Sequence, residues 1–499
     1  MLETLQNLGL GFQVALAPGV LWYGFIGCLV GTLVGMLPGL GPLAGISLLL
    51  PATFGLTPTT AIVLLAGIYY GAMYGGSTTS ILMRIPGEAA SVMTCIDGYA
   101  MTQKGRAGAA LAIAAFSSFF AGTVSLVALT LVAPPLASIA LKFGPPEYFG
   151  LLTMGLLVLA YMSGGSMPKT LAMAALGLFL GTIGIDQMSG FFRFQYGIIE
   201  LGDGIGVVPV AVGLLGLSEV LLVAGSGAPS GITTPRLSEL LPSPAEARQS
   251  IGPTARGTVL GFLIGLVPGS AHIISSFVSY GVERRISRTP DEFGKGAVAG
   301  VAGPEAANNA SAAGMFVPLL ALGLPVTATA AVIIAAMRTY GIQPGPTLMA
   351  DQPELVWTLL ASLLIGNTLL LVINLPLAPL WARLLQIPRP QLYAGILFFA
   401  SLGAYSVNQD PFDLLLLLLF GGIGFAIRRF GIPVLPLILG VILGPLMEQK
   451  MREALDLSNG DISGLFNEIP AVGLYVLIVI IIVAPYFVGL VRSRRRVSA

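Results

Sequence analysis

Two clusters of neutral polar residues lie within apolar stretches of the sequence. The first consists of the consecutive hydroxyl residues Ser77, Thr78, Thr79 and Ser80. The second contains Asn308, Asn309 and Ser311. Hydroxyl groups donate hydrogen bonds to carboxylates, and amide groups offer both donors and acceptors. Hydroxyl and carbonyl oxygens also suit Na⁺, so the clusters predict a site that holds an anion beside a cation without a buried Arg or Lys.

Each cluster follows a break in an apolar, glycine-spaced helix. The break lies in Gly31-Thr-Leu-Val-Gly-Met-Leu-Pro-Gly-Leu-Gly-Pro42, and the motif returns as Gly261-Phe-Leu-Ile-Gly-Leu-Val-Pro-Gly-Ser270. Proline removes a backbone donor, and glycine permits a sharp change of direction. Inside a bilayer the freed backbone groups need partners, and half-helix N-termini attract anions. The predicted substrate site therefore also includes Gly39, Gly41, Gly269 and Ser270.

Two ionisable residues lie near the second break. Glu305 is at apparent membrane depth, where an acid is expected to be functional. The alternative is a residue in the first turn of a helix that starts at Gly303-Pro304 near the cytoplasmic face. His272, the single histidine, could bind substrate or a proton, and the alternative is a structural histidine. We predict coupling-ion roles for Glu305, His272 and Asn308.

Helix packing is a competing interpretation of the polar clusters. Ser and Thr in membrane helices commonly bond their own backbone at helix interfaces. One isolated cluster would favour packing, whereas two clusters that each follow the same Pro-Gly break favour a transport site. Several charged residues near the first cluster are expected to form a solvated cytoplasmic loop. These are Arg84, Glu88, Asp97, Lys104 and Arg106.

The composition indicates a polytopic helical membrane protein. Of 499 residues, 55% are hydrophobic and only 9% are charged, and the mean hydropathy is +0.89. Apolar runs long enough for membrane helices recur along the whole chain. They lie at about 60–83, 108–133, 148–163, 170–185, 205–224, 355–380, 391–407, 412–427, 431–447 and 470–491. Residues 297–337 are too long for one simple helix and are expected to be broken.

Basic residues indicate which loops face the cytoplasm, because cytoplasmic loops carry an excess of Lys and Arg. The polar stretch 226–256 is then a cytoplasmic linker, which divides the chain into the membrane repeats 1–225 and 257–499. Residues 257–282 start and end on the cytoplasmic side. Each arm around Pro268-Gly269, of roughly 12 residues, is too short to cross a bilayer. We therefore predict a re-entrant hairpin.

The first break has the opposite orientation in this topology. After Pro38-Gly39 the chain reaches the uncharged loop 48–58, which the alternation of loops places outside. The same motif thus enters the membrane from opposite faces, which is the pattern of an inverted repeat. The predicted fold class is an all-α polytopic membrane protein with two inverted repeats and broken or re-entrant helices at the Pro-Gly motifs.

The sequence lacks the motifs of the membrane enzymes considered. It has no His-Glu-x-x-His, no Gly-x-Ser-x-Gly and no Gly-x-x-x-x-Gly-Lys-Ser/Thr. Its two cysteines, Cys28 and Cys95, cannot make a Cys-rich metal site or a disulfide framework. The net charge of +1 gives no indication of nucleic-acid binding. We expect no enzymatic activity, no cofactor and no metal other than Na⁺.

The chain resembles the large membrane subunit of tripartite tricarboxylate transporters, the TctA family. The resemblance spans nearly the full length and is specific in its combination of motifs. The matching residues are Gly35-Met-Leu-Pro-Gly-Leu-Gly-Pro42, Tyr70-Gly-Ala-Met-Tyr-Gly-Gly-Ser77, Ile85-Pro-Gly-Glu88, Asp97-Gly-Tyr99, Gly105-Arg-Ala-Gly108 and Pro304-Glu-Ala-Ala-Asn-Asn309.

This resemblance implies a secondary transporter of the bacterial inner membrane, with about twelve helices of bilayer-spanning length. It implies two protein partners, a small four-helix membrane subunit and a periplasmic solute-binding protein. It also implies uptake of citrate or another di- or tricarboxylate, driven by a cation gradient.

Na⁺ is the predicted coupling ion, because neutral oxygen donors beside the breaks outnumber groups that could relay protons. Protons are the alternative. A different class of protein, an anion channel built from the same broken helices, is the second interpretation. A membrane enzyme or scaffold is the third, and the absent catalytic motifs disfavour it.

Overall fold

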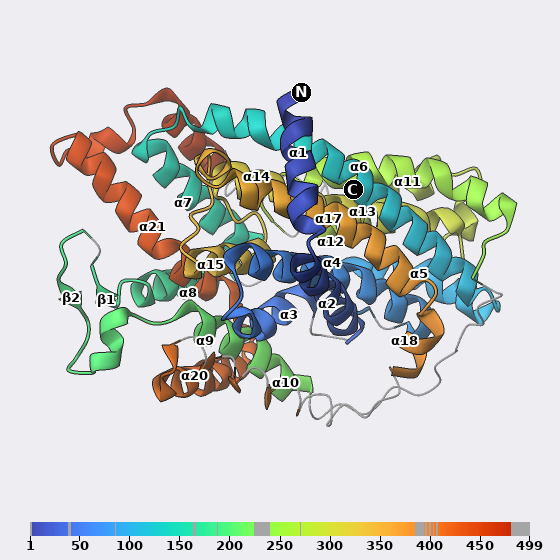
Figure 1. The fold of residues 1–499 in the computed structure, drawn as a ribbon, viewed down its shortest axis with the longest axis horizontal. Coiled ribbons are helices and arrows are strands. Elements are labelled where there is room, and N and C mark those ends of the chain that lie inside the picture. The colour runs from blue at the N-terminus through green and yellow to red at the C-terminus, as the bar shows by residue number, and fades with distance from the viewer. Residues whose placement is uncertain are drawn as a thin grey trace, which may run out of the picture. The chain divides into compact units, whose positions relative to one another are not determined.

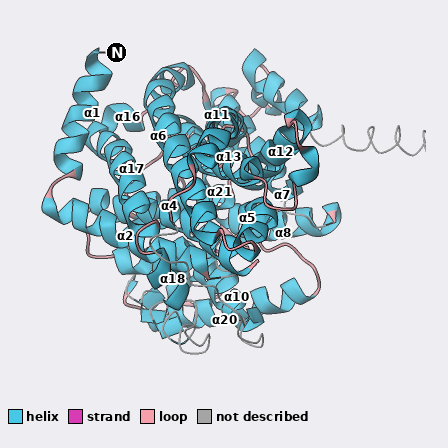
Figure 2. Ribbon diagram, turned by 90° about the vertical axis from the view of Figure 1, so that its right-hand side faces the viewer, coloured by secondary structure: helices cyan, strands magenta, loops and turns pink. Residues whose placement is uncertain are grey.

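The computed structural model describes most of the chain. The described residues are 2–37, 41–84, 86–162, 166–186, 188–223, 240–269, 271–384 and 408–480, with a few positions between 394 and 405. In these ranges the regular secondary structure is helical (Figure 2), apart from one two-stranded hairpin, which Figure 1 shows. The prediction of an all-α protein agrees with this result.

Within the described part of the chain, four helices are long and apolar enough to cross a membrane. They are α2 (Pro18–Met36), α6 (Ala107–Ala140), α17 (Pro353–Asn374) and α20 (Pro411–Arg429). Shorter apolar helices are also present, among them 167–180 and 328–339. The helices follow the apolar runs predicted from the sequence, except that most of the run 391–407 and the end of the run 470–491 lie outside the described residues. The predicted total of about twelve spans stays a prediction.

Contacts divide the chain into two compact units. The first unit contains Met1–Ala137 and Val208–Phe425, and the second contains Ser138–Val207 and Ala426–Ala499. Each unit draws on both predicted repeats, so this division does not test the repeat boundaries. The boundaries at 226–256 stay a prediction, and part of that linker, 226–239, lies outside the described residues.

The first unit holds the predicted site (Figure 1). Besides α2, α6, α17 and α20, its principal helices are α1 (Leu2–Ala15), α3 (Gly41–Leu49), α4 (Pro58–Met83), α5 (Val92–Gln103), α9 (Val207–Ala211), the π-helix η4 (Val212–Leu217), α10 (Ser218–Val223), α11 (Pro244–Gly265), α12 (Ala271–Ile286), α13 (Val298–Gly314), α14 (Phe316–Leu322), α15 (Ala328–Thr339), α16 (Leu348–Asp351) and α18 (Ala378–Leu384). Short 3₁₀ turns lie at Leu50–Thr53, Ala89–Ser91 and Pro290–Glu292.

Two glycine seams organise this unit, one between α2 and α4 and the other between α11 and α13. At each seam glycines four residues apart face the backbone of the partner helix. The pairs are Gly27 with Leu64, Gly31 with Ile68 and Gly35 with Ala72, then Gly257 with Gly303, Gly261 with Ala307 and Gly265 with Ser311. A Cβ at Gly35 would lie 2.1 Å from the Ala72 oxygen, and one at Gly261 would lie 2.2 Å from the Ala307 oxygen. The repeated sequence motif therefore builds the same helix pair twice, while the inversion of the two halves stays a prediction.

At the second Pro-Gly break, a backbone N–H group that no helix uses has its hydrogen-bond partner at another break in the chain. Helix α11 ends at Gly265 and α12 begins at Ala271, and the two helices pack against each other. Between them Gly269 has φ +141° and donates its N–H to the Val326 oxygen at 2.8 Å. Val326 itself lies in the interruption between α14 and α15, so the expected break within 297–337 is confirmed. The hydrogen bond between these two non-helical segments gives the Gly269 N–H group a protein partner, which the hydrocarbon of a bilayer cannot supply.

Two expectations from the sequence are wrong. No helix starts at Gly303-Pro304, because α13 begins at Val298 and runs through Pro304, which leaves Glu305 in mid-helix. The prediction of a solvated loop is wrong for Asp97 and Glu88, whereas Arg84 and Lys104 are exposed as expected. Asp97 is fully buried on α5, and Glu88 is only partly exposed. A run of charged residues in the sequence predicts a solvated segment, because the sequence does not show the hydrogen bonds that the Asp97 and Glu88 carboxylates accept from distant residues.

The second unit is built from helices and one hairpin. Its principal elements are α7 (Pro145–Met162), α8 (Met167–Leu180), strand β1 (Gly184–Ile185), strand β2 (Phe192–Arg193), η3 (Ile199–Asp203), α21 (Leu435–Leu457) and η7 (Ile462–Leu465). Strands β1 and β2 pair antiparallel, with Gly184 opposite Arg193. Helices α8 and α21 approach closely because Gly177 lies against the Leu437 backbone, where a Cβ would meet the carbonyl oxygen at 2.1 Å.

Replacement of a seam glycine by alanine tests the role of the seams. Gly261→Ala should destabilise the protein by about 1–3 kcal/mol, because the new methyl group must push α13 away from α11. Gly281→Ala on α12 is the matched control, since a Cβ there meets nothing within 4 Å. The control should be neutral or slightly stabilising because alanine favours helix. Thermal unfolding of the purified protein in detergent measures both changes, and equal midpoints would contradict the close-packed seam.

Candidate functional site

The carboxylate of Glu305 is the centre of the candidate site. It is buried on α13, with 1% of the residue exposed. Ser77 of α4 donates to both carboxylate oxygens, at 2.7 and 2.8 Å. Thr94 of α5 donates to Oε1, and Ser118 of α6 donates to Oε2 at 3.3 Å. Three hydroxyl groups from three different helices thus replace the water around this acid.

No ion pair involves Glu305 among the residues that the structure describes. A buried carboxylate without a basic partner is stable only with a proton or a cation beside it. A cavity of about 20 Å³ adjoins the acid and is lined by Ser77, Thr78, Ser118 and Asn374. This volume holds about one water molecule, or one ion of similar size. It is far below the roughly 300 Å³ of a typical organic-ligand pocket.

The side-chain amides of Asn308 and Asn309 use their nitrogen atoms for hydrogen bonds and, within the described part of the chain, leave their oxygen atoms unbonded. The Asn308 amide donates to Glu88 Oε1 at 3.0 Å, and the Asn309 amide donates to Ser118 Oγ at 2.7 Å. Both Oδ1 atoms are buried and have no hydrogen-bond partner among the described residues. Buried acceptors are normally satisfied, so these two oxygens are available to a cation or to a donor on a ligand.

His272 belongs to a neighbouring polar group. Its Nδ1 lies 2.9 Å from Ser311 Oγ, and its Nε2 lies 3.2 Å from the Tyr69 hydroxyl. The Ser311 hydroxyl donates its own proton to the backbone carbonyl oxygen of Asn308 at 2.8 Å. The proton between His272 and Ser311 therefore comes from Nδ1, which assigns Nδ1 as the donor. Both ring nitrogens therefore have protein partners, as the structural alternative requires. A coupling role for His272 stays a prediction.

The hydroxyl run divides into two groups. Ser77 binds Glu305, and Thr78 lines the cavity beside it. Thr79 and Ser80 donate instead to the Gly76 carbonyl of their own helix, at 3.0 and 2.9 Å. The packing interpretation therefore describes the last two residues of the run, and the site interpretation suits the first two.

The predicted half-helix positions are only partly described. Gly39 and Ser270 lie outside the described residues. Gly41 begins α3 with φ +58°, and the space around it is open within 4 Å. The N–H group of Gly269 already has a protein acceptor, so this glycine offers no free donor to an anion. Substrate binding at these four positions stays a prediction.

Sequence patterns did not identify several residues of this site. Thr94 and Ser118 bind Glu305 from distant parts of the chain, and Glu88 binds Asn308. One signal was present for Ser118, because Ser117 and Ser118 interrupt the apolar run 108–133. Nothing in its own segment marks Thr94.

Asp97 positions α13 beside α5. Its Oδ1 accepts the backbone N–H groups of Gly294, Gly296 and Ala297 at 2.9, 2.7 and 2.8 Å, and its Oδ2 accepts the Tyr280 hydroxyl at 2.9 Å. Asp97 lies one turn after Thr94 on α5. It thereby holds the start of α13 against the helix whose threonine reaches Glu305.

Broken apolar helices around a buried polar site are the architecture of membrane transport proteins. A comparison with protein families identifies the kind of transporter. The model of the tripartite tricarboxylate transporter TctA family matches residues 21–439, and the chain belongs to this family. It is therefore a membrane protein of a transporter family, not of an enzyme family, and a subunit of a transporter that has other subunits.

Two relatives from Agrobacterium vitis share high identity with the chain. The "Uncharacterized 52.8 kDa protein in TAR-I ttuC' 3'region" is 48% identical over 461 residues, which cover 92% of each chain. The "Uncharacterized protein in TAR-II ttuC' 3'region" is 47% identical over 201 residues, which cover 40% of this chain and 83% of the relative. No solved structure gives a significant match.

Asp97→Asn should loosen the start of α13. The variant keeps the size of the side chain but loses the charge that strengthens its hydrogen bonds, at a cost of about 1–3 kcal/mol. Backbone amides at Gly294, Gly296 and Ala297 should exchange with deuterium roughly 5- to 150-fold faster, as measured by mass spectrometry. Asp291→Asn, at an exposed position of the same loop, is the control. Unchanged exchange in both variants would show that Asp97 does not hold this loop.

Proposed function

We propose that this subunit imports a small organic acid of the di- or tricarboxylate type, such as citrate, together with Na⁺. The observation that carries the proposal is the Glu305 carboxylate. Among the residues described, only hydroxyl groups bind it, and it lies one helical turn from the unpartnered Asn309 oxygen. Membership of a tripartite tricarboxylate transporter family supports the substrate class.

The cation part of the proposal rests on the donor set. Carboxylate, hydroxyl and amide oxygens are the ligands that hard cations prefer. Glu305, Ser77 and Asn374 supply one of each kind to the lining of the adjoining cavity of about 20 Å³, which takes a single ion. The unpartnered Asn309 oxygen lies one helical turn from Glu305, outside that lining. A cation bound in the cavity would neutralise Glu305 and so remove the need for a buried basic residue.

The substrate part of the proposal rests on charge. A multiply charged anion costs about 2.3 kcal/mol per charge for each 100 mV of opposing membrane potential, so its import requires accompanying cations. The organic acid would bind next to the cation, between the two helix breaks and the asparagine pair. Because the cavity beside Glu305 is too small for it, substrate binding requires the helices around the site to separate.

We further propose that the subunit acts in the bacterial inner membrane with two partners. They are a small four-helix membrane subunit and a periplasmic solute-binding protein that delivers the substrate. The family's tripartite organisation supports this number of partners.

The competing proposal is an anion channel. A channel shows no trans-stimulated exchange of labelled substrate, so a counterflow assay distinguishes a channel from a transporter.

The coupling ion can be tested by reconstituted uptake. The complete complex with its binding protein should accumulate substrate under a Na⁺ gradient alone and should fail under a pH gradient alone. The reason is that neutral oxygen donors dominate the described site, whose carboxylates and imidazole are Glu88, beside Asn308, and the two proposed proton carriers Glu305 and His272. Uptake that follows the pH gradient and ignores Na⁺ would replace Na⁺ coupling with proton coupling through these two residues.

Removal of the unpartnered amide oxygens should weaken cation binding. Asn308→Ala and Asn309→Ala should each raise the Na⁺ concentration for half-maximal uptake by roughly 5- to 150-fold, which corresponds to about 1–3 kcal/mol. Asn367→Ala is a matched control, because Asn367 is also buried with an unpartnered Oδ1 but binds Phe119 and Thr123 of α6. Normal Na⁺ dependence in both site variants, at normal membrane levels, would remove the asparagine pair from the cation site.

A further inference from the structure

The segment Ile185–Ile199 of the second unit, here called the aromatic hairpin, exposes an unusual number of apolar side chains. Phe191 is 75% exposed, Phe192 60%, Tyr196 81% and Ile199 84%. In Figure 1 the hairpin extends beyond the end of α8. Scattered exposed apolar residues are normal, whereas such a concentration in one short segment indicates an interaction site.

The aromatic hairpin cannot lie in the hydrocarbon core of a membrane. Its strands β1 and β2 have two residues each, so most of its backbone groups are not paired in a ladder. Irregular backbone of this kind is not tolerated against lipid tails. The exposed aromatic side chains therefore face water, headgroups or another protein.

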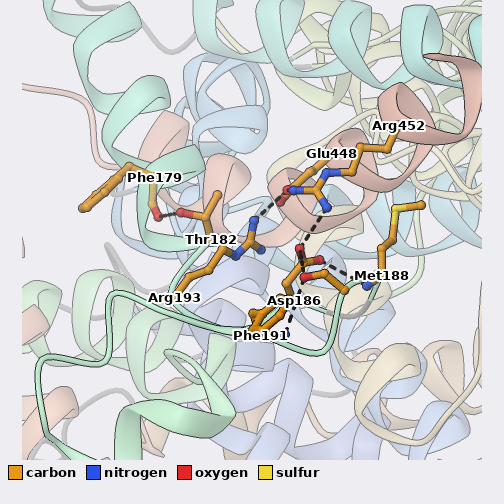
Figure 3. Close-up of polar contacts among 9 residues, drawn as sticks. Phe179, Thr182, Asp186, Met188, Phe191, Arg193, Glu448 and Arg452 are labelled. Carbon is orange, nitrogen blue, oxygen red and sulfur yellow. Dashed lines mark hydrogen bonds and ion pairs between the residues drawn. The ribbon is translucent and has the colours of Figure 1, made fainter. Parts of the chain in front are cut away.

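A network of ion pairs fixes the base of the hairpin (Figure 3). Arg452 of α21 binds Asp186 at 2.8 Å and Glu448 at 2.7 Å, and Arg193 binds Glu448 at 2.6 Å. Hydrogen bonds from the Ser189 hydroxyl and the Met188 amide hold the pKa of Asp186 well below its usual range, so this carboxylate stays ionised at neutral pH. Ion pairs and hydrogen bonds thus hold the base of the hairpin to α21, whereas the tip of the hairpin is exposed.

The tip itself holds two bulky residues in a strained backbone. Phe194 has φ +54° and Tyr196 has φ +49°, a region that aromatic residues seldom occupy. The Phe194 ring packs on Phe179 of α8 at 5.1 Å, whereas Tyr196 points its ring outward. Strain that positions an exposed aromatic ring is typical of functional surfaces.

The surroundings of the hairpin are acidic. Residues 182–206 and 445–456 contain six acidic and three basic side chains. Within the described residues the three basic side chains pair with Asp186, Glu448 and Glu453, while no ion pair involves Glu200, Asp203 or Asp456. A cavity of about 360 Å³ beside the hairpin has room for an inserted side chain. Its charged lining consists of four acidic side chains, Asp186, Asp203, Glu448 and Glu453, and two basic ones, Arg193 and Arg452, so the acidic groups are in excess.

We propose that the aromatic hairpin and this acidic cavity form a docking surface for a water-soluble protein subunit of the transporter. The partner presents an apolar patch edged by Lys or Arg, one of which enters the cavity. This inference rests on the proposed function, because it assigns a surface to one of the subunits proposed there. The acidic rim disfavours a lipid surface, since anionic headgroups repel it. An apolar centre with a charged rim is also the usual composition of a protein interface.

Binding measurements on the intact membrane complex in nanodiscs test the docking surface. The probe is the purified solute-binding protein of the same transporter. The triple variant Phe191→Ser, Tyr196→Ser and Ile199→Ser should weaken its binding at least 30-fold, and Glu200→Lys with Asp203→Lys should weaken it and reverse its salt dependence. Leu241→Ser with Ile286→Ser, at exposed positions of the first unit, should leave binding unchanged.

Two results would overturn the inference. One is unchanged binding of the solute-binding protein to the triple variant, with thermal unfolding like that of the wild type. The other is strong quenching of the Phe191→Trp variant by brominated lipids without the partner, which would assign the hairpin to the membrane. The binding assay needs no transport, so failure of Na⁺-driven uptake would reject the proposed function and leave this test intact.

Discussion

The burial of Glu305 is the constraint on which the rest of the site depends. A carboxylate inside a protein loses its hydration, and here hydroxyl groups of α4, α5 and α6 replace the lost water. Glycine seams hold two of the helices around the acid at backbone distance from a partner, α4 against α2 and α13 against α11. Hydroxyl groups do not neutralise the charge, so the site remains incomplete without a proton or a cation.

Much of the fold follows from local sequence patterns. Apolar runs predicted most of the described helices, and the repeated motif predicted related helix breaks, while the glycine seams between helix pairs became apparent only from the structure. Glu305 was also identified from its depth in an apolar region. The partners of Glu305 could not be predicted in the same way, because Thr94 and Ser118 come from other helices and single hydroxyl residues are common in membrane helices. The burial of Asp97 depends on a loop about 200 residues further along the chain, which local charge patterns cannot show.

The structure also separates two clusters that look equivalent in sequence. Ala72 and Ser311 occupy corresponding places, because each faces the third glycine of its seam. By this correspondence Asn308 and Asn309 match Tyr69 and Tyr70, and Ser77 matches the apolar Phe316. A repeated scaffold therefore carries different side chains in its two halves. The seams follow the symmetry of the repeat, whereas the polar chemistry between them does not.

The glycine seams have a mechanical consequence. Where backbones touch, one helix cannot slide past the other without a collision between carbonyl groups, so each seam ties its two helices into one rigid rod. The interface between α4 and α13 is different, since water can replace its hydroxyl–carboxylate bonds at little net free energy. Relative motion between rods is therefore easiest across the surface that contains Glu305. Separation of the rods would then break the same hydrogen bonds that Ser77 donates to the Glu305 carboxylate.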